Sequence, residues 1–567
     1  MTLLRLTEEE DKVRREIEST INGLHRRLNS FALINRLPPE LLAEIFCFCR
    51  DAHWGVRKGD KGKFEHVGLR LRWTMVILVC RHWRDVAERT PRLWAHINFD
   101  HPKFSRGRSM VLAKGSPLHL LVNTWNDEQS ALFKDINMDN VYSIDVTIRL
   151  IQGSPGALNV IPPSTSPIRF LEVSHIHEKL TDFLSIFAKC TFPAIQRLAL
   201  CNMSGTVPSC LLGSTLKDLV LRTRHSLFVN PIELIRNLSQ MSQLESLTVS
   251  GVVFRVQPDQ HTSDLFTQKV SLPSLHGLDL QPPPNAQLDY LALLRCMDLP
   301  PQMRALRLTF PHKIPDSALY AILRIASQLL RLCTFRSMAL HTNKSDNPET
   351  FNIQLWQEVI SPHELGTLVE LGLSPVSISL PDASQDSRIV WDEFLHTIDL
   401  QYVESLQVAN LWVKMKILGD WRRFFGTTPR LKNLILKGKI ARTVIGILGG
   451  PRAKKAKSNG DEEIVQPVIF PVETIRLSKV EWRTEAEVDD DKDGSFIRNL
   501  LSLKKRRGSV RPPINLVIRD CSNMDYSDVD LFERKGWEVE WDDDDDDDEG
   551  SGFNFFALTD SDSDDVY

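Results

Sequence analysis

The stretch Leu37-Pro38-Pro39-Glu40-Leu41-Leu42-Ala43-Glu44-Ile45-Phe46 decides how the N-terminal part of this chain folds. Two consecutive prolines hold φ near −65° and cannot continue a preceding helix, but proline is well tolerated in the first turn of a new one. Leu41, Leu42, Ile45, Phe46 and Cys49 then recur at one-turn spacing. This spacing predicts a helix on which the five side chains share one face.

A second apolar helix is predicted further along the chain. Val76, Val79, Cys80, Trp83 and Ala87 lie at i, i+3, i+4, i+7 and i+11, and residues 90–94 follow as a stop and a short apolar turn. These short helices carry more large apolar groups than they can cover on each other. Part of this surface must therefore meet the rest of the chain or another protein.

These residues resemble an F-box, over residues 35–98. The Leu-Pro opening and acidic-apolar helix of that family correspond to residues 37–46, its Val-Cys-Arg-x-Trp core to residues 79–83, and its Pro-x-Leu-Trp element to residues 91–94. The resemblance implies docking on the adaptor subunit of an SCF-type cullin–RING ubiquitin ligase, with an unknown protein substrate bound by the C-terminal remainder. The adaptor-binding residues that it implies are Leu37, Pro38, Pro39, Leu41, Leu42, Ile45, Phe46, Val79, Cys80, Trp83, Leu93 and Trp94. Residues 50–72 depart from the family as a polar, basic, glycine-containing insertion that must loop out.

A second signal is the recurring pattern apolar-x-x-apolar-x-apolar. Its first seven copies start 27, 27, 21, 28, 31 and 28 residues apart, and helix-like apolar spacing fills several of the intervals. A strand and a helix every 20–29 residues is the period of a leucine-rich repeat, and the segments resemble that family in an irregular form, because most lack the Asn or Cys that normally follows. A non-solenoid α/β domain is the alternative. The copies are residues 141–146, 168–173, 195–200, 216–221, 244–249, 275–280, 303–308, 368–373, 403–408, 431–436 and 472–477, with a degenerate copy at 330–335.

The predicted fold class is therefore α/β: an N-terminal helical F-box followed by an irregular leucine-rich-repeat solenoid of parallel strands and helices. The predicted domains are an N-terminal helix (1–34), the F-box (35–98), the repeat domain (99–541) and an acidic disordered tail (542–567). Segments 341–350, 450–463 and 485–495 combine low apolar content with polar or charged residues, which predicts disordered insertions. Residues 514–518 and 537–541 are expected to supply closing strands.

The N-terminal helix, expected over residues 7–30, has a narrow apolar seam. Most other positions are charged, and the residues of the seam step by four and three: Val13, Ile17, Ile21, Leu24, Leu28 and Phe31. Two interpretations stay open: the seam packs on the neighbouring F-box, or it forms a short coiled coil with a partner.

Composition limits the class of protein. The chain has 567 residues and a formal net charge of −4, but residues 538–567 hold fourteen of its 73 acidic residues and no Lys or Arg, so the remainder carries about +10. Nine scattered cysteines without a CxxC pair favour free thiols in a reducing compartment. No apolar run approaches a membrane span of roughly 20 residues, and the acidic start is unlike a secretory signal. We expect an intracellular protein, cytoplasmic or nuclear, without membrane contact.

The sequence contains no catalytic constellation: no P-loop, GxGxxG, HExxH or GxSxG motif is present. Cys47, Cys49 and His53 are close, but the two cysteines point about 200° apart on a helix, so core thiols are favoured over zinc. We expect no enzyme activity, no cofactor and no metal. Basic clusters at residues 452–457 and 504–507 are predicted in loops, as nuclear import signals, contacts to an acidic partner or plain solvated loops. They lack flanking aromatic platforms, so nucleic-acid binding is not expected.

Two functions follow from these observations. The first is a substrate-recognition subunit of an SCF-type ubiquitin ligase. The second is a non-catalytic repeat scaffold that binds protein partners without ubiquitin ligase assembly, with the F-box-like helices as an internal cap.

Overall fold

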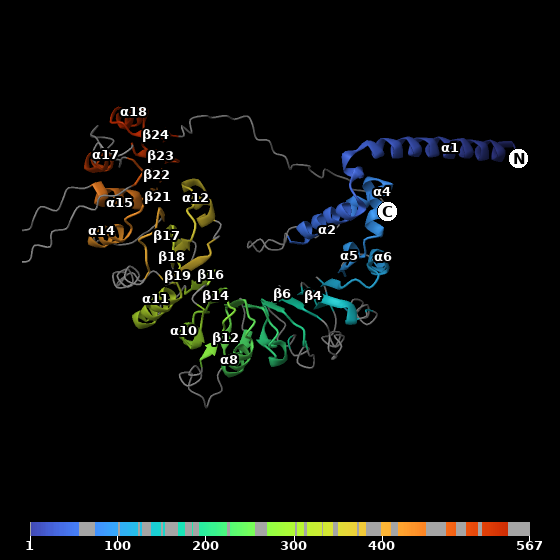
Figure 1. The fold of residues 1–567 in the computed structure, drawn as a ribbon, viewed down its shortest axis with the longest axis horizontal. Coiled ribbons are helices and arrows are strands. Elements are labelled where there is room, and N and C mark those ends of the chain that lie inside the picture. The colour runs from blue at the N-terminus through green and yellow to red at the C-terminus, as the bar shows by residue number, and fades with distance from the viewer. Residues whose placement is uncertain are drawn as a thin grey trace, which may run out of the picture. The chain divides into compact units, whose positions relative to one another are not determined.

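A computed structural model shows a chain of two compact units, Met1–Met303 and Arg304–Tyr567. We describe each unit by itself. The F-box-like helices and the first eight strands of the main parallel ladder belong to the first unit (Figure 1). The structure describes residues 2–541 except 56–73, 100–102, 123–124, 127–135, 137, 149–150, 153–167, 176–183, 185–191, 224–226, 256–268, 301–302, 311–314, 331–332, 344–349, 371–373, 382–397, 410–417, 450–471, 483–494 and 508–512.

The first unit begins with helices that close around a small core. The core joins buried side chains of α2, α4 and α5 to Ala113 of α6, with Leu118 of β2 packed against it. The predicted second helix is two helices, because Cys80 has an extended backbone (φ −160°, ψ 169°) that separates α3 from α4. The elements are α1 (Thr2–Phe31), η1 (Leu33–Arg36), α2 (Pro39–Gly55), α3 (Val76–Val79), α4 (Arg81–Glu88), α5 (Pro91–Trp94) and α6 (Lys103–Ala113).

Eight parallel strands follow, each hydrogen-bonded to the next in chain order. Helices α8 (Pro231–Gln240) and α10 (Gln287–Cys296) lie along one side of these strands (Figure 1). The strands are β1 (His96–Asn98), β2 (Leu118–Val122), β4 (Val141–Ile148), β6 (Phe170–His175), β7 (Arg197–Cys201), β9 (Asp218–Arg222), β11 (Ser246–Ser250) and β14 (Gly277–Gln281). Three small parallel sheets join β3 (Trp125–Asn126) to β5 (Ile151–Gln152), β10 (Leu227–Val229) to β8 (Gly205–Thr206) and β12 (Val253–Phe254), and β13 (Val270–Ser271) to β15 (Met297–Asp298).

The described part of the second unit contains nine strands of the main sheet, one of which is antiparallel to its two neighbours. Strand β18 is antiparallel to β17 and β19, and the other pairs are parallel. In spatial order the strands are β16 (Ala305–Thr309), β19 (Val376–Pro381), β18 (Thr350–Trp356), β17 (Ser337–Asn343), β20 (Ser405–Ala409), β21 (Asn433–Lys437), β22 (Thr474–Ser478), β23 (Asn515–Arg519) and β24 (Glu538–Trp541). The described helices of this unit are α11 (Asp316–Leu330), α12 (Pro362–Glu370), α14 (Leu418–Thr427), α15 (Ile440–Gly449), α17 (Ser495–Arg507) and α18 (Tyr526–Arg534).

The recurring apolar pattern marks most of these strands. From β6 to β16, and again from β20 to β22, each strand of the main sheet starts two residues after the first apolar residue of a copy. The three apolar side chains of a copy such as Leu216, Leu219 and Leu221 are fully buried. Both expected closing strands are present as β23 and β24. The pattern therefore places one face of each strand against the interior.

Two copies of the pattern were assigned wrongly. Leu368 and Val369 lie in α12, because the Ser361 side chain accepts a hydrogen bond from the Glu364 N–H and starts a helix there. Leu330 ends α11. The strand β17 instead belongs to a copy formed by the buried residues Phe335, Met338 and Leu340, and it starts two residues after Phe335. The disordered insertion predicted at 341–350 is wrong at both ends, because residues 341–343 end β17 and Thr350 begins β18. Residues 344–349 lie outside the described residues.

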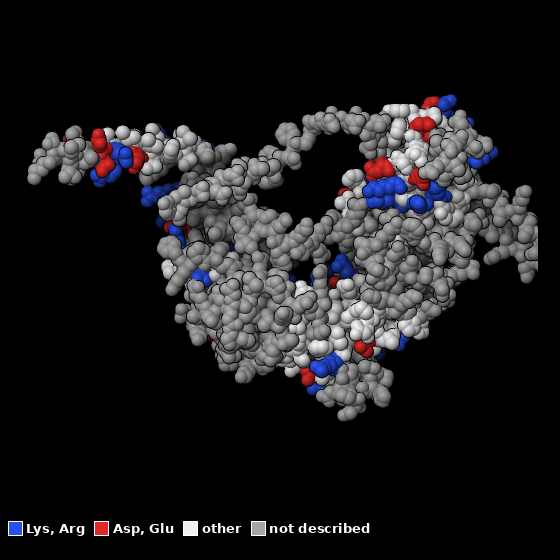
Figure 2. Space-filling model, turned by 180° about the vertical axis from the view of Figure 1, so that it is seen from behind, with Lys and Arg blue, Asp and Glu red and all other residues white. Residues whose placement is uncertain are grey.

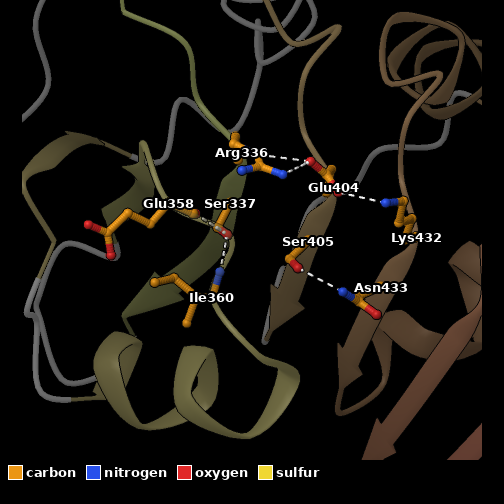
Figure 3. A network of polar contacts seen from close by, with 8 residues as sticks. All are labelled: Arg336, Ser337, Glu358, Ile360, Glu404, Ser405, Lys432 and Asn433. Carbon is orange, nitrogen blue, oxygen red and sulfur yellow. Dashed lines mark hydrogen bonds and ion pairs between the residues drawn. The ribbon is translucent and has the colours of Figure 1, made fainter.

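Neighbouring strands are also joined at one repeated main-chain position. The carbonyl oxygen of the residue just before a strand accepts two N–H groups from the start of the neighbouring strand: that of Glu404 accepts from Lys432 at 2.8 Å and Asn433 at 2.9 Å. Figure 3 shows this region, with the Glu404 side chain between Arg336 and Lys432. The same double acceptance occurs at Arg169, Gln196, Lys217, Glu245, Arg336, Glu404 and Lys432.

The predicted acidic tail at 542–567 and the insertions at 450–463 and 485–494 lie outside the described residues. Ser495, the last residue of the third predicted insertion, begins α17. The basic cluster at 504–507 does not lie in a loop: it ends α17, and the Lys504 ammonium group donates a hydrogen bond to the carbonyl oxygen of Lys535 at 2.5 Å. Within the described part of the chain, no helix is both long and apolar enough to cross a membrane.

Candidate adaptor-binding surface

Helix α2 is apolar on two opposite faces. Leu42 and Phe46 point into the core of the helical region, where they are buried. Leu41, Ile45 and Phe48 expose 52%, 38% and 74% of their surface. Ala43 and Cys47 are buried in the same core, and at about 100° per residue the centre of this four-residue inner stripe lies roughly 160° from the centre of the outer stripe. The single face predicted from the sequence is therefore wrong: Leu41 and Ile45 point outward, and Leu42 and Phe46 point inward.

The structure separates the twelve residues implied by the resemblance into three groups. Those that are buried serve the core of the domain and offer no side chain to a partner. Those that are exposed stay candidates for adaptor contact. The buried group is Leu42, Phe46, Leu93 and Trp94; the half-buried group is Leu37, Cys80 and Trp83; the exposed group is Pro38, Pro39, Leu41, Ile45 and Val79.

Three exposed apolar residues of this region were missed by the sequence reasoning. Phe48 extends the outer stripe of α2 by one turn, and Met75 and Leu78 lie beside Val79 at α3, with 59% and 63% of their surface exposed. The signal for Phe48 was present, since it follows Leu41 and Ile45 at i+7 and i+3. The exposure of Met75 and Leu78 could not be predicted from the sequence, because the break between α3 and α4 at Cys80 decides which side of α3 faces solvent.

Trp83 joins several elements. Its indole N–H donates to Asn35 Oδ1 at 2.6 Å, and the Asn35 amide donates to the carbonyl oxygen of Asn29 at 2.6 Å. Its ring lies 5.2 Å from that of Phe46, centroid to centroid. Trp83 therefore ties the end of α1 and η1 to α4, and its replacement would disturb the fold as well as any contact surface.

Charged groups close the end of α2 on α5. The buried Arg50 donates from Nη1 to the carbonyl oxygen of Arg92 at 2.5 Å and forms an ion pair with Asp51 at 2.7 Å. Arg92 in turn pairs with Glu44. These interactions fix α2 against α5, so the outer stripe of α2 is held on a rigid element.

The helical region continues into the sheet through two stacked histidines. The His96 and His119 rings, on β1 and β2, lie 4.4 Å apart and almost parallel, and His119 Nδ1 is 2.6 Å from the Ser143 hydroxyl. Burial, with the nearby Arg50 guanidinium, lowers the pKa of His96 to about 2 and lowers that of His119. Both rings are neutral at pH 7. They border a cavity of about 240 Å³ whose wall includes Arg50 and Tyr142.

The described residues include no group of three side chains that could hold a metal ion. Burial raises the pKa of the Cys47 thiol, which suits a core position, and the side chain of His53 lies outside the described residues. Burial likewise raises the pKa of Cys201 and Cys296, each to about 11. Thiols of this kind stay protonated at neutral pH and are poor nucleophiles.

Comparison with known proteins gives one result for this region. Residues 34–100 match the family model described as F-box-like, over nearly the same span as the resemblance seen in the sequence. A comparison with curated proteins found no match to the chain. An F-box domain suggests, in general, the role of a non-catalytic substrate adaptor in an SCF-type ubiquitin ligase, and such domains bind the adaptor subunit of that complex. The family match over these residues and the helical region that they form support an F-box protein.

Proposed function

We propose that this chain is a substrate-recognition subunit of an SCF-type ubiquitin ligase, acting inside the cell, and that it docks on the adaptor through the outer faces of α2 and α3. The observation that carries the proposal is the second apolar face of α2. A helix that is apolar on both sides is normally buried on both sides, and here one side is open. Adaptor contact would cover Leu41, Ile45 and Phe48.

The two faces of α2 permit a direct test with purified full-length protein and purified adaptor. A double change of the outer stripe, Leu41→Ser with Ile45→Ser, should weaken adaptor binding by about 30-fold or more, since central apolar residues of an interface each contribute about 1–2 kcal/mol. The far-ultraviolet circular dichroism should stay unchanged, because both side chains are already exposed.

Two further variants make the result specific. Phe46→Ala removes an inward-pointing ring and should lower the free energy of unfolding by about 3–5 kcal/mol. Any loss of adaptor binding in this variant follows from that destabilisation, because Phe46 offers no surface to the adaptor. Val111→Ser removes an apolar side chain of α6 that is more exposed than Leu41 or Ile45, and it should leave adaptor binding unchanged. Retention of full affinity by the outer-stripe variant would sink the proposed docking mode.

We also propose that the strands form an irregular leucine-rich-repeat array that binds the substrate. The repeat period, the buried apolar positions and the recurring double acceptance at the residue before a strand support this interpretation. In the second unit, α12 covers the sheet face opposite the interior: Leu365 and Val369 pack with Ala339 of β17 and Ile435 of β21. A substrate would therefore bind the corresponding face of the first unit, where Asp145, Glu172 and Asp279 occupy one cross-strand row.

A scaffold without ubiquitin ligase assembly is the second candidate. One observation favours it: the core of the F-box-like helices continues into Ala113 and Leu118, as expected of a cap on the first strands. In this case the full-length protein fails to retain the adaptor in a pull-down, whereas the first proposal requires retention.

A further inference from the structure

Helix α1 presents an apolar stripe that no other part of the described chain covers. The helix has 30 residues. Six apolar side chains between residues 13 and 31 expose between 46% and 73% of their surface. The predicted packing of this seam against the F-box-like helices is not found. The side chains are Val13, Ile17, Ile21, Leu24, Leu28 and Phe31.

The stripe has the spacing of a coiled-coil seam. From Ile17 to Phe31 the steps are four, three, four and three, which places Ile17, Leu24 and Phe31 at d and Ile21 and Leu28 at a. Figure 2 shows side chains of both charges on α1, next to uncharged ones. Charged residues at the flanking e and g positions decide which partner and which orientation such a seam accepts.

We propose that α1 pairs with α1 of a second copy of this chain in an antiparallel coiled coil. In the antiparallel register, a residues of one helix meet d residues of the other, so Ile17 lies against Leu28 of the second copy and Ile21 against Leu24. The same register places Arg14, the next a residue, against the aromatic ring of Phe31. Every seam position from 14 to 31 then has a favourable partner.

The parallel arrangement is disfavoured by the charges of α1. It would place Arg14 against Arg14 of the second copy, and Glu10, at the preceding d position, against Glu10. In the antiparallel pair, e positions face e positions, so Glu18 of each copy lies beside His25 of the other. The sequence of α1 is thus complementary to itself only when reversed, which favours a second copy over an unrelated helix.

The test is the mass of the full-length protein, measured by light scattering and sedimentation equilibrium at tens of micromolar and pH 7.5. We expect a dimer. Leu24→Asp places a carboxylate at the centre of the seam and should give a monomer with unchanged core stability, because Leu24 is exposed in the single chain. Arg15→Glu, on the outer face of the helix, is the matched control and should remain dimeric.

A charge exchange tests the orientation. His25→Glu sets a second carboxylate beside Glu18 at both ends of the antiparallel dimer and should raise its dissociation constant about tenfold. Adding Glu18→Lys should restore the affinity, since each copy then offers a Lys–Glu pair. A monomeric wild type, a Leu24→Asp variant that stays dimeric, or a double variant without rescue would overturn the proposal. So would binding of α1 to the adaptor in place of a second copy. The proposal does not depend on ubiquitin ligase assembly.

Discussion

Gly251 follows the end of β11, where its main chain comes close to that of Thr223 after β9. Its φ is +72°, a left-handed conformation that L side chains rarely adopt, and a Cβ atom there would come within 1.9 Å of the carbonyl oxygen of Thr223. Its N–H donates to the carbonyl oxygen of Gln281 at 2.7 Å. Any other residue at this position would clash with the Thr223 carbonyl group and would also be strained at this φ angle.

We therefore expect Gly251→Ala to destabilise the first unit by roughly 3 kcal/mol, through strain and the displaced carbonyl. Denaturant unfolding followed by fluorescence measures this change. Gly426→Ala, at an α14 position where an added Cβ meets nothing within 4 Å, is the control and should be neutral or slightly stabilising. An unchanged midpoint for Gly251→Ala would contradict the geometry.

Leu41 and Leu42 show what the sequence could and could not predict about the candidate site. The spacing of apolar residues predicted the helix and its start correctly. It did not separate the inward leucine from the outward one, because apolar residues surround most of α2 and the side that faces the core depends on α4 and α5. The exposed set was therefore visible only after packing was known.

At the scale of elements, β1 and β2 are joined by the stacked rings of His96 and His119, with the Arg50 guanidinium close by. The pKa of His96 is about 2 in the folded chain and near 6.5 when unfolded, so the unfolded state binds the proton first as pH falls. The stabilisation is complete above pH 6.5 and is lost progressively below it.

Lowering the pH from 6.5 to 5.5 should thus cost the first unit about 1 kcal/mol through His96, and the lowered pKa of His119 adds a loss of the same sign. Hydrogen exchange of peptides that cover β1 and β2, corrected for the intrinsic rate, measures the loss. His96→Asn should reduce the pH dependence of that protection. Equal dependence in the variant and the wild type would show that His96 is not the titrating group.

A second element-scale interaction joins three strands of the second unit. The Glu404 carboxylate accepts a hydrogen bond from Arg336 and forms an ion pair with Lys432 (Figure 3). Arg336, Glu404 and Lys432 are the residues just before β17, β20 and β21, respectively. Hydrogen bonds from Lys432 and Arg336 lower the pKa of the Glu404 carboxyl. Because that pKa is depressed on folding, the stabilisation is present above about pH 4.5 and is lost as pH falls through the lowered value.

Glu404→Gln should therefore destabilise the second unit by about 1 kcal/mol at pH 7, a modest amount because both cations are half-exposed and screened by salt. The difference from the wild type should be smaller at pH 3 than at pH 7, because protonation of Glu404 removes its charge. Urea unfolding at the two pH values decides the matter, and a difference that persists at low pH would argue for lost packing.

The strands themselves were largely predictable, for a physical reason. When two apolar residues are separated by one other residue, they lie on the same face only if the run is a strand. The run also recurs along the chain, which makes the strand prediction more secure. The same reasoning failed at Leu368, since Val369 and Leu365 fit a helical spacing equally well over so short a stretch. The signal that decided the outcome was Ser361-Pro362-His363-Glu364, a helix-capping sequence.

At the scale of the whole molecule, the F-box-like helices and the first strands are one folding body. Trp94 and Phe46 share a core with Ala113, and His96 and Ile97 of β1 pair with His119 and Leu120 of β2. A deletion of residues 1–98 would remove β1 together with most of this core. It would leave the edge of β2 and the apolar side of α6 without cover.

We expect the chain from residue 99 onward to aggregate or to melt at a lower temperature than the full chain, whether or not the protein assembles into a ubiquitin ligase. Differential scanning calorimetry with light scattering measures both outcomes. A stable, monodisperse fragment would show that the helices are a separable module. Point changes on the outer stripe of α2 are thus the cleaner probe of adaptor binding.

The double acceptance by the carbonyl before seven of the described strands has an evolutionary consequence. Since it uses only main-chain atoms, substitutions at the side chains around it leave the joint between neighbouring strands intact. The residues displayed along the strands of the first unit can therefore diversify between related proteins without dismantling the stack. If the substrate binds this face as proposed, a new recognition specificity could arise there by ordinary point mutation, or be selected from a library randomised at those positions.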